Sequence, residues 1–247
     1  GVLPQIAADV LPGLSATDAE AAIAQAGWLI SLYALGVVVG APTIAASVAK
    51  YPRHRVMLAL AAALTLFNAL TFLMPNFELI AVSRFLAGLP HGAYFGIGAL
   101  VASDVLGPGS RARGAAFILS GLTVANIVGV PLGTFLGQQL GWRIAFAIVA
   151  GIFALTTVLV ALFVPAHAGD PARTLRAELS AFRIPQVWFA IGIGAVGFGG
   201  FFAAYSYIAP IVTHVAGAPE WAVPIVLVVM GVGMTVGNLI GGHLADI

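Results

Sequence analysis

Long apolar stretches alternate with short polar connections along most of the chain. Seven of these stretches are long enough to cross a bilayer, and they cover Gln25–Val48, Val56–Met74, Leu79–Ser103, Gly114–Gln138, Ile144–Val164, Val187–Val212 and Trp221–Leu244. A membrane-spanning helix needs about 20 apolar residues, whereas a strand of a membrane barrel needs about ten with alternating polarity. The pattern therefore predicts membrane-spanning helices. Residues 1–8 are expected to be the last turns of a further span.

Composition supports a protein embedded in a lipid bilayer and excludes several other classes. Hydrophobic residues make up 61% of the 247 residues and charged residues only 8%, far from the balance of a soluble domain. The net charge of +1, without any basic run, excludes nucleic acid as a partner. Because the chain has no cysteine, disulfides and thiolate metal sites are excluded, and we predict no cofactor and no metal.

Charged residues divide the predicted connections into two sets. The basic connections carry Lys50, Arg53 and Arg55, then Arg111 and Arg113, then Arg173, Arg176 and Arg183. The other connections carry Asp9, Asp18, Glu20, Glu78 and Glu220, with Arg143 as their one basic residue. If every stretch spans, the basic connections all lie on one side, which the positive-inside rule predicts to be cytoplasmic.

A tryptophan stands near the end of several predicted spans. These residues are Trp28, Trp142, Trp188 and Trp221. At that depth an indole ring can bury its face in lipid and keep its N–H in contact with water, so we expect interface anchors. Ordinary packing aromatics are the alternative.

One predicted span carries an arginine and a regular row of glycines. Arg84 is followed at four-residue steps by Gly88, Gly92 and Gly96. Small residues at this spacing make a smooth stripe on which a neighbouring helix packs closely. An arginine is costly in lipid, so Arg84 is expected to face protein or water.

The stretch from Arg84 to Gly92 resembles the RxxxGxxxG motif in the fourth helix of the major facilitator superfamily. In the next span, Gly121 precedes Gly129, Pro131, Gly133 and Gly137, a run similar to the glycine-proline motif of the exporters in that superfamily. Val130 departs from the usual Gly-Pro pair of that motif.

Two further segments resemble the superfamily's loop motif. In residues 49–55, Ala49 replaces the motif's aspartate and Pro52 its glycine, so a latch that uses this aspartate is expected to be absent. The second copy keeps a GxxxD start, from Gly242 to Asp246. The spacing of these copies fits two parallel repeats of six helices. Together with Gly141, Trp142 and Arg143 ahead of the sixth helix, the motifs are most similar to the drug:proton antiporter branch, particularly arabinose-efflux-permease-like members.

This resemblance implies an all-α membrane protein with a major-facilitator-type helical bundle, truncated at both ends. We expect a six-helix N-terminal bundle with an incomplete first helix at 1–164, a cytoplasmic linker at 165–183 that serves as a tether rather than an amphipathic surface helix, and the first two helices of the C-terminal bundle at 184–247. The implied function is export of a small solute, a drug-like compound or a sugar, by alternating access in exchange for protons. The implied location is a bacterial inner membrane, and the full-length protein is expected to be a monomer.

Polar residues at mid-span depth are the candidates for the substrate or proton pathway. They are His91, Asn126, Tyr205, Ser206, Tyr207 and Asn238. His91 follows Pro90 and titrates near neutral pH, which makes it a candidate for proton coupling. A neutral histidine hydrogen-bonded between helices is the alternative. Arg84 is expected to make a structural or gating pair with an acidic residue, or to attract an anionic group.

Other residues are candidates for gating or packing. Asp104 is expected to form a charge cluster with Arg53, Arg55, Arg111 and Arg113 that holds the cytoplasmic face shut, the alternative being solvated loop charges. Close helix packing is expected at the glycines and the proline of both motifs, and a latch role at Asp246. These packing positions are Gly88, Gly92, Gly129, Pro131, Gly133 and Gly137.

Three other functions remain open from the sequence. An importer of a small metabolite differs from an exporter only in direction. An intramembrane enzyme lacks its expected motifs, since the sequence has no HExxH zinc signature, no GxSxG elbow and no mid-span carboxylate pair. A channel is disfavoured because no repeated polar filter-like segment is visible.

Overall fold

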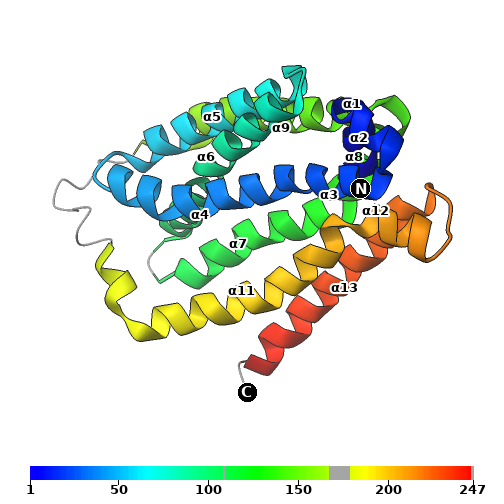
Figure 1. Cartoon of the computed structure of the whole chain (residues 1–247). Coiled ribbons are helices and arrows are strands. Elements are labelled where there is room, and N and C mark those ends of the chain that lie inside the picture. Colours follow the sequence, from blue (N-terminus) through cyan, green and yellow to red (C-terminus); the bar gives the residue numbers. More distant parts are fainter. Residues whose placement is uncertain (108, 167–178, 246–247) are drawn as a thin grey trace.

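The computed structural model describes residues 1–107, 109–166 and 179–245 and, within these, all side chains except those of residues 111, 112, 181 and 238–245. Every regular element in these ranges is a helix, and none of the described residues forms a strand (Figure 1). The elements are α1 (Leu3–Val10), α2 (Pro12–Thr17), α3 (Ala19–Ala26), α4 (Trp28–Val48), α5 (Arg53–Leu73), α6 (Phe77–Leu106), α7 (Arg111–Val124), η1 (Ala125–Gly129), α8 (Val130–Leu140), α9 (Trp142–Phe163), η2 (Ser180–Arg183), α11 (Pro185–Ser206), α12 (Ile208–Pro210), η3 (Ile211–Val215) and α13 (Ala222–Ala245).

Within the described ranges, 6 helices are long and apolar enough to cross a membrane. They cover Ala19–Val48, Arg53–Leu73, Phe77–Leu106, Arg113–Leu140, Trp142–Phe163 and Pro185–Ser206. A shorter apolar helix follows at Ala222–Gly237, and α1 occupies the place where the end of a further span was expected. The predicted all-helical membrane architecture is confirmed.

The connections between the long helices gather at two opposite ends of the molecule (Figure 1). One end holds the α4–α5 and α6–α7 connections and the start of α11. We call it the basic end because Lys50, Arg53, Arg55, Arg113 and Arg183 lie there. The opposite end holds α2, α3, α12 and η3, and we call it the acidic end because Asp18, Glu20 and Glu220 lie there. Assignment of the basic end to the cytoplasm stays a prediction.

Side-chain caps extend two helices beyond their predicted starts. Asp18 precedes α3 and accepts a hydrogen bond from the Ala21 N–H at 2.9 Å, and Asn76 precedes α6 and accepts one from the Leu79 N–H at 3.0 Å. Gly27 is itself helical, so α3 and α4 run on as one helix. The span predicted to start at Gln25 therefore starts at Ala19, and part of the predicted acidic loop is helical.

Prolines interrupt two spans that were predicted to be continuous. Pro131 cannot donate a hydrogen bond to the carbonyl four residues before it, and the preceding turn widens into the π-helix η1, in which the Val130 N–H bonds to the Ala125 carbonyl. Pro210 likewise cannot donate to Ser206, and α11 ends there. The predicted span Val187–Val212 is therefore divided into α11, α12 and η3.

Glycines bring α4 and α6 into close contact. A Cβ atom on Gly88 would lie 2.9 Å from the Cα atom of Gly36, and one on Gly92 would lie 2.6 Å from the Cβ atom of Ala41. Neither position has space for a side chain. The glycine stripe of α6 therefore packs against α4, apart from Gly96, whose Cβ would meet no atom within 4 Å among the described residues.

Candidate transport site and its two ends

A polar cluster joins α4 and α6 inside two of the spans. The Tyr33 hydroxyl and Nδ1 of His91 share a hydrogen bond of 2.7 Å, and the two rings meet edge to face with centroids 5.5 Å apart. The Arg84 guanidinium lies over the Tyr33 ring, 4.1 Å from its centroid. All three side chains are partly buried. Together they form the candidate transport site.

The glycine contact between the helices explains why these side chains meet. Tyr33 precedes Gly36 by one turn, and a Cβ atom on Gly88 would overlap the Tyr33 carbonyl oxygen. The backbones are therefore close enough for the Tyr33 ring to lie between Arg84 and His91. Tyr33 was not among the predicted site residues. Its spacing of three and seven residues before Gly36 and Gly40, on one helix face, is a signal that could have found it but was not used.

Arg84 was expected to pair with an acidic residue or an anionic group. Its guanidinium instead lies over two aromatic rings, 4.1 Å from the Tyr33 centroid and 5.1 Å from that of Phe146 in α9. No carboxylate of a described residue forms an ion pair with it. Each cation–π contact contributes about 0.5–2 kcal/mol, so aromatic faces take part of the role expected of an acid.

Asn126 lies in the π-helix η1, where helices that precede residue 167 in the chain meet helices that follow residue 178. It is buried, its amide donates to the Leu122 carbonyl at 2.9 Å, and its Oδ1 accepts a hydrogen bond from the Tyr205 hydroxyl at 3.3 Å. A Cβ atom on Gly231 of α13 would lie 2.7 Å from the Asn126 carbonyl oxygen. The π-turn is therefore a surface on which α13 packs, and α11 reaches it through the Tyr205 hydroxyl.

Tyr205, Ser206 and Tyr207 lie at the end of α11, not at its middle as predicted. The last turn of α11 holds Tyr205 and Ser206, and Tyr207 follows as its C-cap. The Tyr207 ring packs against the cluster that contains Leu3 and Ala22, and a Cβ atom on Gly27 would overlap its hydroxyl. Tyr207 thus belongs to the contact between α3 and α12 at the acidic end.

The acidic end also contains a charged cluster that was not predicted. The Asp9 carboxylate of α1 accepts a hydrogen bond of 3.0 Å from the Trp142 indole and forms an ion pair with Arg143. Arg143 also donates to the Met74 carbonyl at 3.3 Å. Partial burial alone would raise the pKa of Asp9, but the hydrogen bonds from Arg143 and Trp142 and the charge of Arg143 outweigh it and hold this pKa below its ordinary value.

The predicted interface anchors have different surroundings. Trp142 is 3% exposed and its N–H is bonded to Asp9, so the prediction of a lipid-facing anchor is wrong for this residue. Its position at the start of α9 brings it against α1, and protein replaces lipid around the ring. Trp28 and Trp221 are largely exposed, as is Trp188, whose N–H donates to the Phe182 carbonyl at 2.7 Å.

At the basic end, Arg53 of α5 forms an ion pair with Asp104 of α6. The pair joins two neighbouring helices, α5 and α6, both of which precede residue 167 in the chain. Arg55 and Arg113 are exposed, and neither has an ion pair in the part of the chain that the structure describes. The side chain of Arg111 lies outside the described set.

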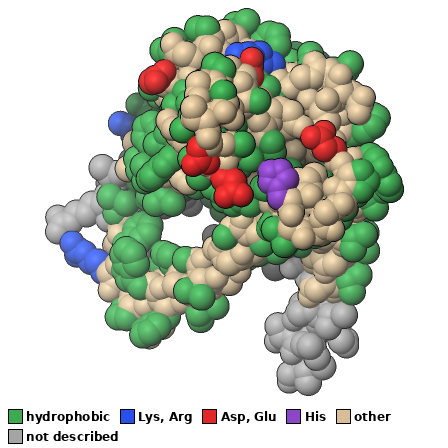
Figure 2. Space-filling model, turned by 45° about the vertical axis from the view of Figure 1, so that its right-hand side comes forward, with side chains coloured by type: hydrophobic (Ala, Val, Ile, Leu, Met, Phe, Trp, Pro, Cys, Tyr) green, Lys and Arg blue, Asp and Glu red, His purple; other side chains and the backbone are tan. Residues whose placement is uncertain are grey.

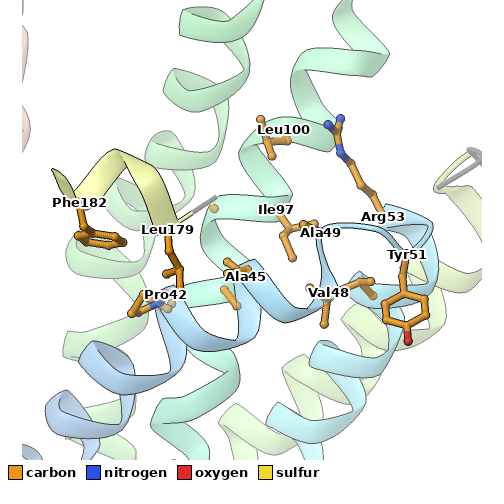
Figure 3. Close-up of a pocket in the computed structure, with 16 residues that line it drawn as sticks. Pro42, Ala45, Val48, Ala49, Tyr51, Arg53, Ile97, Leu100, Leu179 and Phe182 are labelled. Carbon is orange, nitrogen blue, oxygen red and sulfur yellow. The ribbon is translucent and has the colours of Figure 1, made fainter. Parts of the chain in front are cut away.

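A pocket of about 540 Å³ lies beside this ion pair, between α4 and α6 (Figure 3). Its walls are mostly apolar, with Pro42, Ala45 and Ile97 on the two helices and Arg53 at its edge. Leu179 and Phe182, which precede α11, line it from the other side. Ala49 also lines it, at the position where the loop motif has its aspartate.

The predicted packing positions in α8 and η1 do not behave alike. A Cβ atom on Gly137 would lie 2.7 Å from a Val2 methyl group, so this glycine lies against the start of the chain. Pro131 is buried. A Cβ atom on Gly133 would meet nothing within 4 Å, and one on Gly129 only the Ala125 methyl at 3.8 Å, among the described residues.

Two predicted site residues lie outside the described set. The backbone of Asn238 is part of α13, but its side chain is not described. Asp246 follows the last described residue. The described side chains include no group of three or more histidine, aspartate or glutamate residues that would hold a metal ion.

The family model of the Major Facilitator Superfamily matches residues 5–247. The chain belongs to this superfamily. The family and the membrane-helical fold predicted from the motifs are thereby confirmed. The motif residues of α6 and α8, the close α4–α6 packing and the polar cluster are thus features of a major facilitator protein.

Curated relatives of this major facilitator chain share about a third of its residues. AraJ of Escherichia coli K12 is 36% identical over 245 residues, which cover 99% of this chain and 60% of AraJ. The inner membrane transport protein YdhP of the same organism is 37% identical over 100% of this chain and 61% of YdhP. The chloramphenicol resistance protein of Streptomyces lividans is 32% identical over 100% of this chain and 62% of that protein.

The chain spans about 60% of the length of these relatives. With six candidate spans among its described residues and a relative named for the inner membrane, the predicted multi-pass location in a bacterial inner membrane is confirmed.

Proposed function

We propose that this chain is part of a secondary active transporter that exports a small solute, a drug-like compound or a sugar, by alternating access and in exchange for protons. The observation that carries the proposal is the hydrogen bond between Tyr33 and His91 beside Arg84, inside the spans of a major facilitator protein. Ionisable side chains within a membrane are expensive and are typical of proton pathways. Histidine changes its charge near physiological pH, which suits it to bind and release the coupled proton.

Contacts between the helices before and after the proposed linker support alternating access. In such a cycle, two bundles rock about a central site that opens to one side at a time. The helices before and after the linker meet through Tyr205 with Asn126, Gly231 with the π-turn, and Tyr207 with Gly27. These contacts lie between the middle of the span Arg113–Leu140 and the acidic end. We propose that they form and break during transport. The Arg53–Asp104 pair is proposed to keep the basic ends of α5 and α6 together as they move.

Export is favoured over import by two comparisons. The glycine-proline run around Pro131 resembles the motif of the superfamily's exporters, and one relative at 32% identity is named for resistance to chloramphenicol. Removal of a drug from the cell is a direct route to resistance. Import of a small metabolite is the second candidate, because the same site and the same proton gradient can serve either direction.

Transport is tested with the full-length protein in proteoliposomes under an imposed pH gradient. Uptake of chloramphenicol and of arabinose, measured with radiolabelled solute, is expected for at least one of them and is expected to stop when a protonophore removes the gradient. Solute counterflow without a gradient separates exchange by a transporter from flux through a pore and from catalysis. A protein that carries neither a drug-like compound nor a sugar against its gradient contradicts the proposal.

The role of His91 is tested by His91→Gln, which keeps a polar side chain and removes the titrating ring. Proton-driven transport is expected to be lost while counterflow continues. His214→Gln is the matched control, because His214 is an exposed histidine of η3 at the acidic end. Full proton-dependent transport by His91→Gln would show that this histidine is structural.

A further inference from the structure

Tyr33 stands between the two groups that the proposed function uses. Its hydroxyl shares a hydrogen bond of 2.7 Å with Nδ1 of His91, and its ring lies under the Arg84 guanidinium at 4.1 Å. No sequence motif pointed to it, and it lies 58 residues from His91 along the chain. A side chain in contact with both the cation and the imidazole can transmit a change at one to the other.

The surroundings of His91 leave few other partners. The charged or titratable side chains that face it are Tyr33 from α4 and Arg84 from its own helix. The charged residues of α5, α7 and α9 lie in the first turns of those helices, at the ends of the bundle. Nδ1 of His91 is therefore occupied by the Tyr33 hydroxyl, and a proton that reaches this nitrogen must come by way of that hydroxyl.

Arg84 favours one direction for this hydrogen bond. A cation over the face of an aromatic ring draws electron density from it, and a phenol that loses electron density becomes a stronger hydrogen-bond donor. This favours the Tyr33 hydroxyl as the donor to Nδ1, the arrangement in which neutral His91 carries its own hydrogen on Nε2. Without Tyr33 the two tautomers of the ring would be free to exchange.

We propose that Tyr33 is the positioning residue that fixes the tautomer of His91 and relays the coupled proton to it. A hydronium ion in the pathway gives a proton to the Tyr33 oxygen and leaves as water, while the original hydroxyl proton passes from Tyr33 to Nδ1. Tyr33 is neutral before and after the step, and His91 becomes an imidazolium. Proton release follows the same path in reverse. This inference rests on the proposed function for its transport role, whereas the tautomer does not depend on it.

Tyr33→Phe in the full-length protein removes only the hydroxyl and keeps the ring under Arg84. The matched control is Tyr94→Phe, because Tyr94 lies on the same helix as His91, packs edge to face with Phe153 at 6.3 Å, and has no hydrogen bond of its hydroxyl among the described residues. Nitrogen NMR of ¹⁵N-histidine-labelled protein in lipid nanodiscs, with the His91 signals assigned by their loss in His91→Gln, reports the tautomer directly.

The unmutated protein and Tyr94→Phe are expected to show His91 with hydrogen on Nε2, and Tyr33→Phe a mixture of tautomers. Proton-driven transport by Tyr33→Phe is expected to fall about tenfold with a changed pH profile, because a partly buried acceptor loses its donor, while counterflow stays within about twofold. A purely structural role would lower both activities together.

Each failure points to a different proposal. If the unmutated protein shows hydrogen on Nδ1, or if Tyr33→Phe leaves both the tautomer and the pH profile unchanged, the relay is wrong. An absence of proton-driven transport in the unmutated protein overturns the proposed function and the relay step, and the NMR measurement still decides whether Tyr33 fixes the tautomer. Poor yield of Tyr33→Phe does not prevent a decision, since the unmutated protein alone can show the wrong tautomer.

Discussion

Asp9 accepts a hydrogen bond of 3.0 Å from the indole N–H of Trp142, although the two residues are 133 positions apart. This bond connects the end of α1 to the start of α9. Arg143, the neighbour of Trp142, adds an ion pair to the same carboxylate and a hydrogen bond to the carbonyl of Met74, the C-cap of α5. Three helices, α1, α5 and α9, are thus tied together at the acidic end, so the cluster stabilises their packing.

Removal of the Asp9 charge is expected to lower stability and to change its pH dependence. The pKa of Asp9 is below its ordinary value in the folded protein, so its contribution is present above about pH 4 and is lost as the pH falls through the folded pKa. Asp9→Asn is expected to lower the free energy of unfolding by about 0.5–1 kcal/mol at pH 7, since the pair is partly exposed. Thermal unfolding in detergent between pH 3 and 7 measures this.

Glu78→Gln is the control for that experiment. Glu78 is an exposed acid in the first turn of α6, and it has no ion pair among the described residues. Its removal is expected to lower the unfolding midpoint by less than Asp9→Asn does, because the Glu78 carboxylate interacts with the α6 helix dipole but with no described partner side chain. Equal effects of the two substitutions would show that the loss comes from net charge and not from the cluster.

Gly88 and Gly96 provide a matched test of the helix contact under the candidate site. A methyl group at Gly88 would overlap the backbone of α4, whereas one at Gly96 would meet nothing within 4 Å among the described residues. Gly88→Ala is expected to destabilise the protein by about 1–3 kcal/mol and to abolish transport. Gly96→Ala is expected to be neutral or stabilising by up to about 1 kcal/mol, because alanine favours helix. Unfolding midpoints and transport of both variants show whether the contact is as close as described.

Gly231 tests the contact across the linker. A Cβ atom there would lie 2.7 Å from the Asn126 carbonyl oxygen, whereas one on Gly233 would contact no described atom within 4 Å. Gly231→Val is expected to separate α13 from the π-turn and to reduce transport at least tenfold, and Gly233→Val to keep it. Transport in proteoliposomes is the measurement, with yields compared by immunoblot. Equal transport by both variants would mean that the contact is not used in the cycle.

The Arg53–Asp104 pair is tested by exchange of its charges. Asp104→Asn is expected to reduce transport and to loosen the basic ends of α5 and α6, which disulfide crosslinking of cysteines introduced into the two helices would report. The double variant Arg53→Asp, Asp104→Arg restores opposite charges and is expected to recover most of the loss. Crosslinking that does not change in Asp104→Asn would contradict a role for the pair in holding these helices together.

Hydrophobicity predicted where the spans lie, because lipid leaves a chain few structures other than continuous helices. The ends of the helices depend on caps and prolines, which hydrophobicity does not predict. Asp18 caps α3, so the span predicted to start at Gln25 starts at Ala19. Pro210 ends α11 before the apolar run ends. One difference comes from a hydrogen bond between the Ala21 N–H and the Asp18 side chain, and the other from the N–H that Pro210 lacks; an average over apolar residues registers neither.

The candidate site was only partly predictable for a different reason. Arg84 and His91 stood out as polar residues within a span, but Tyr33 is an ordinary aromatic until α4 lies against α6. Trp142 was misjudged in the same way, since its partner Asp9 is near only in the folded chain. Pairing between distant segments depends on helix packing, which one sequence without its relatives does not define.

The extra residue in η1 changes the direction in which side chains point along the span Arg113–Leu140. Because η1 contains one residue more than an α-helical turn, the side chains after it are rotated by about 100° around the helix axis. A helical wheel drawn for Arg111–Val124 therefore does not predict which face the residues of Val130–Leu140 occupy. A hydrophobic periodicity calculated over both segments mixes two faces of the helix. Deleting one residue between Ala125 and Gly129 would rotate Pro131 and Gly137 away from their present neighbours.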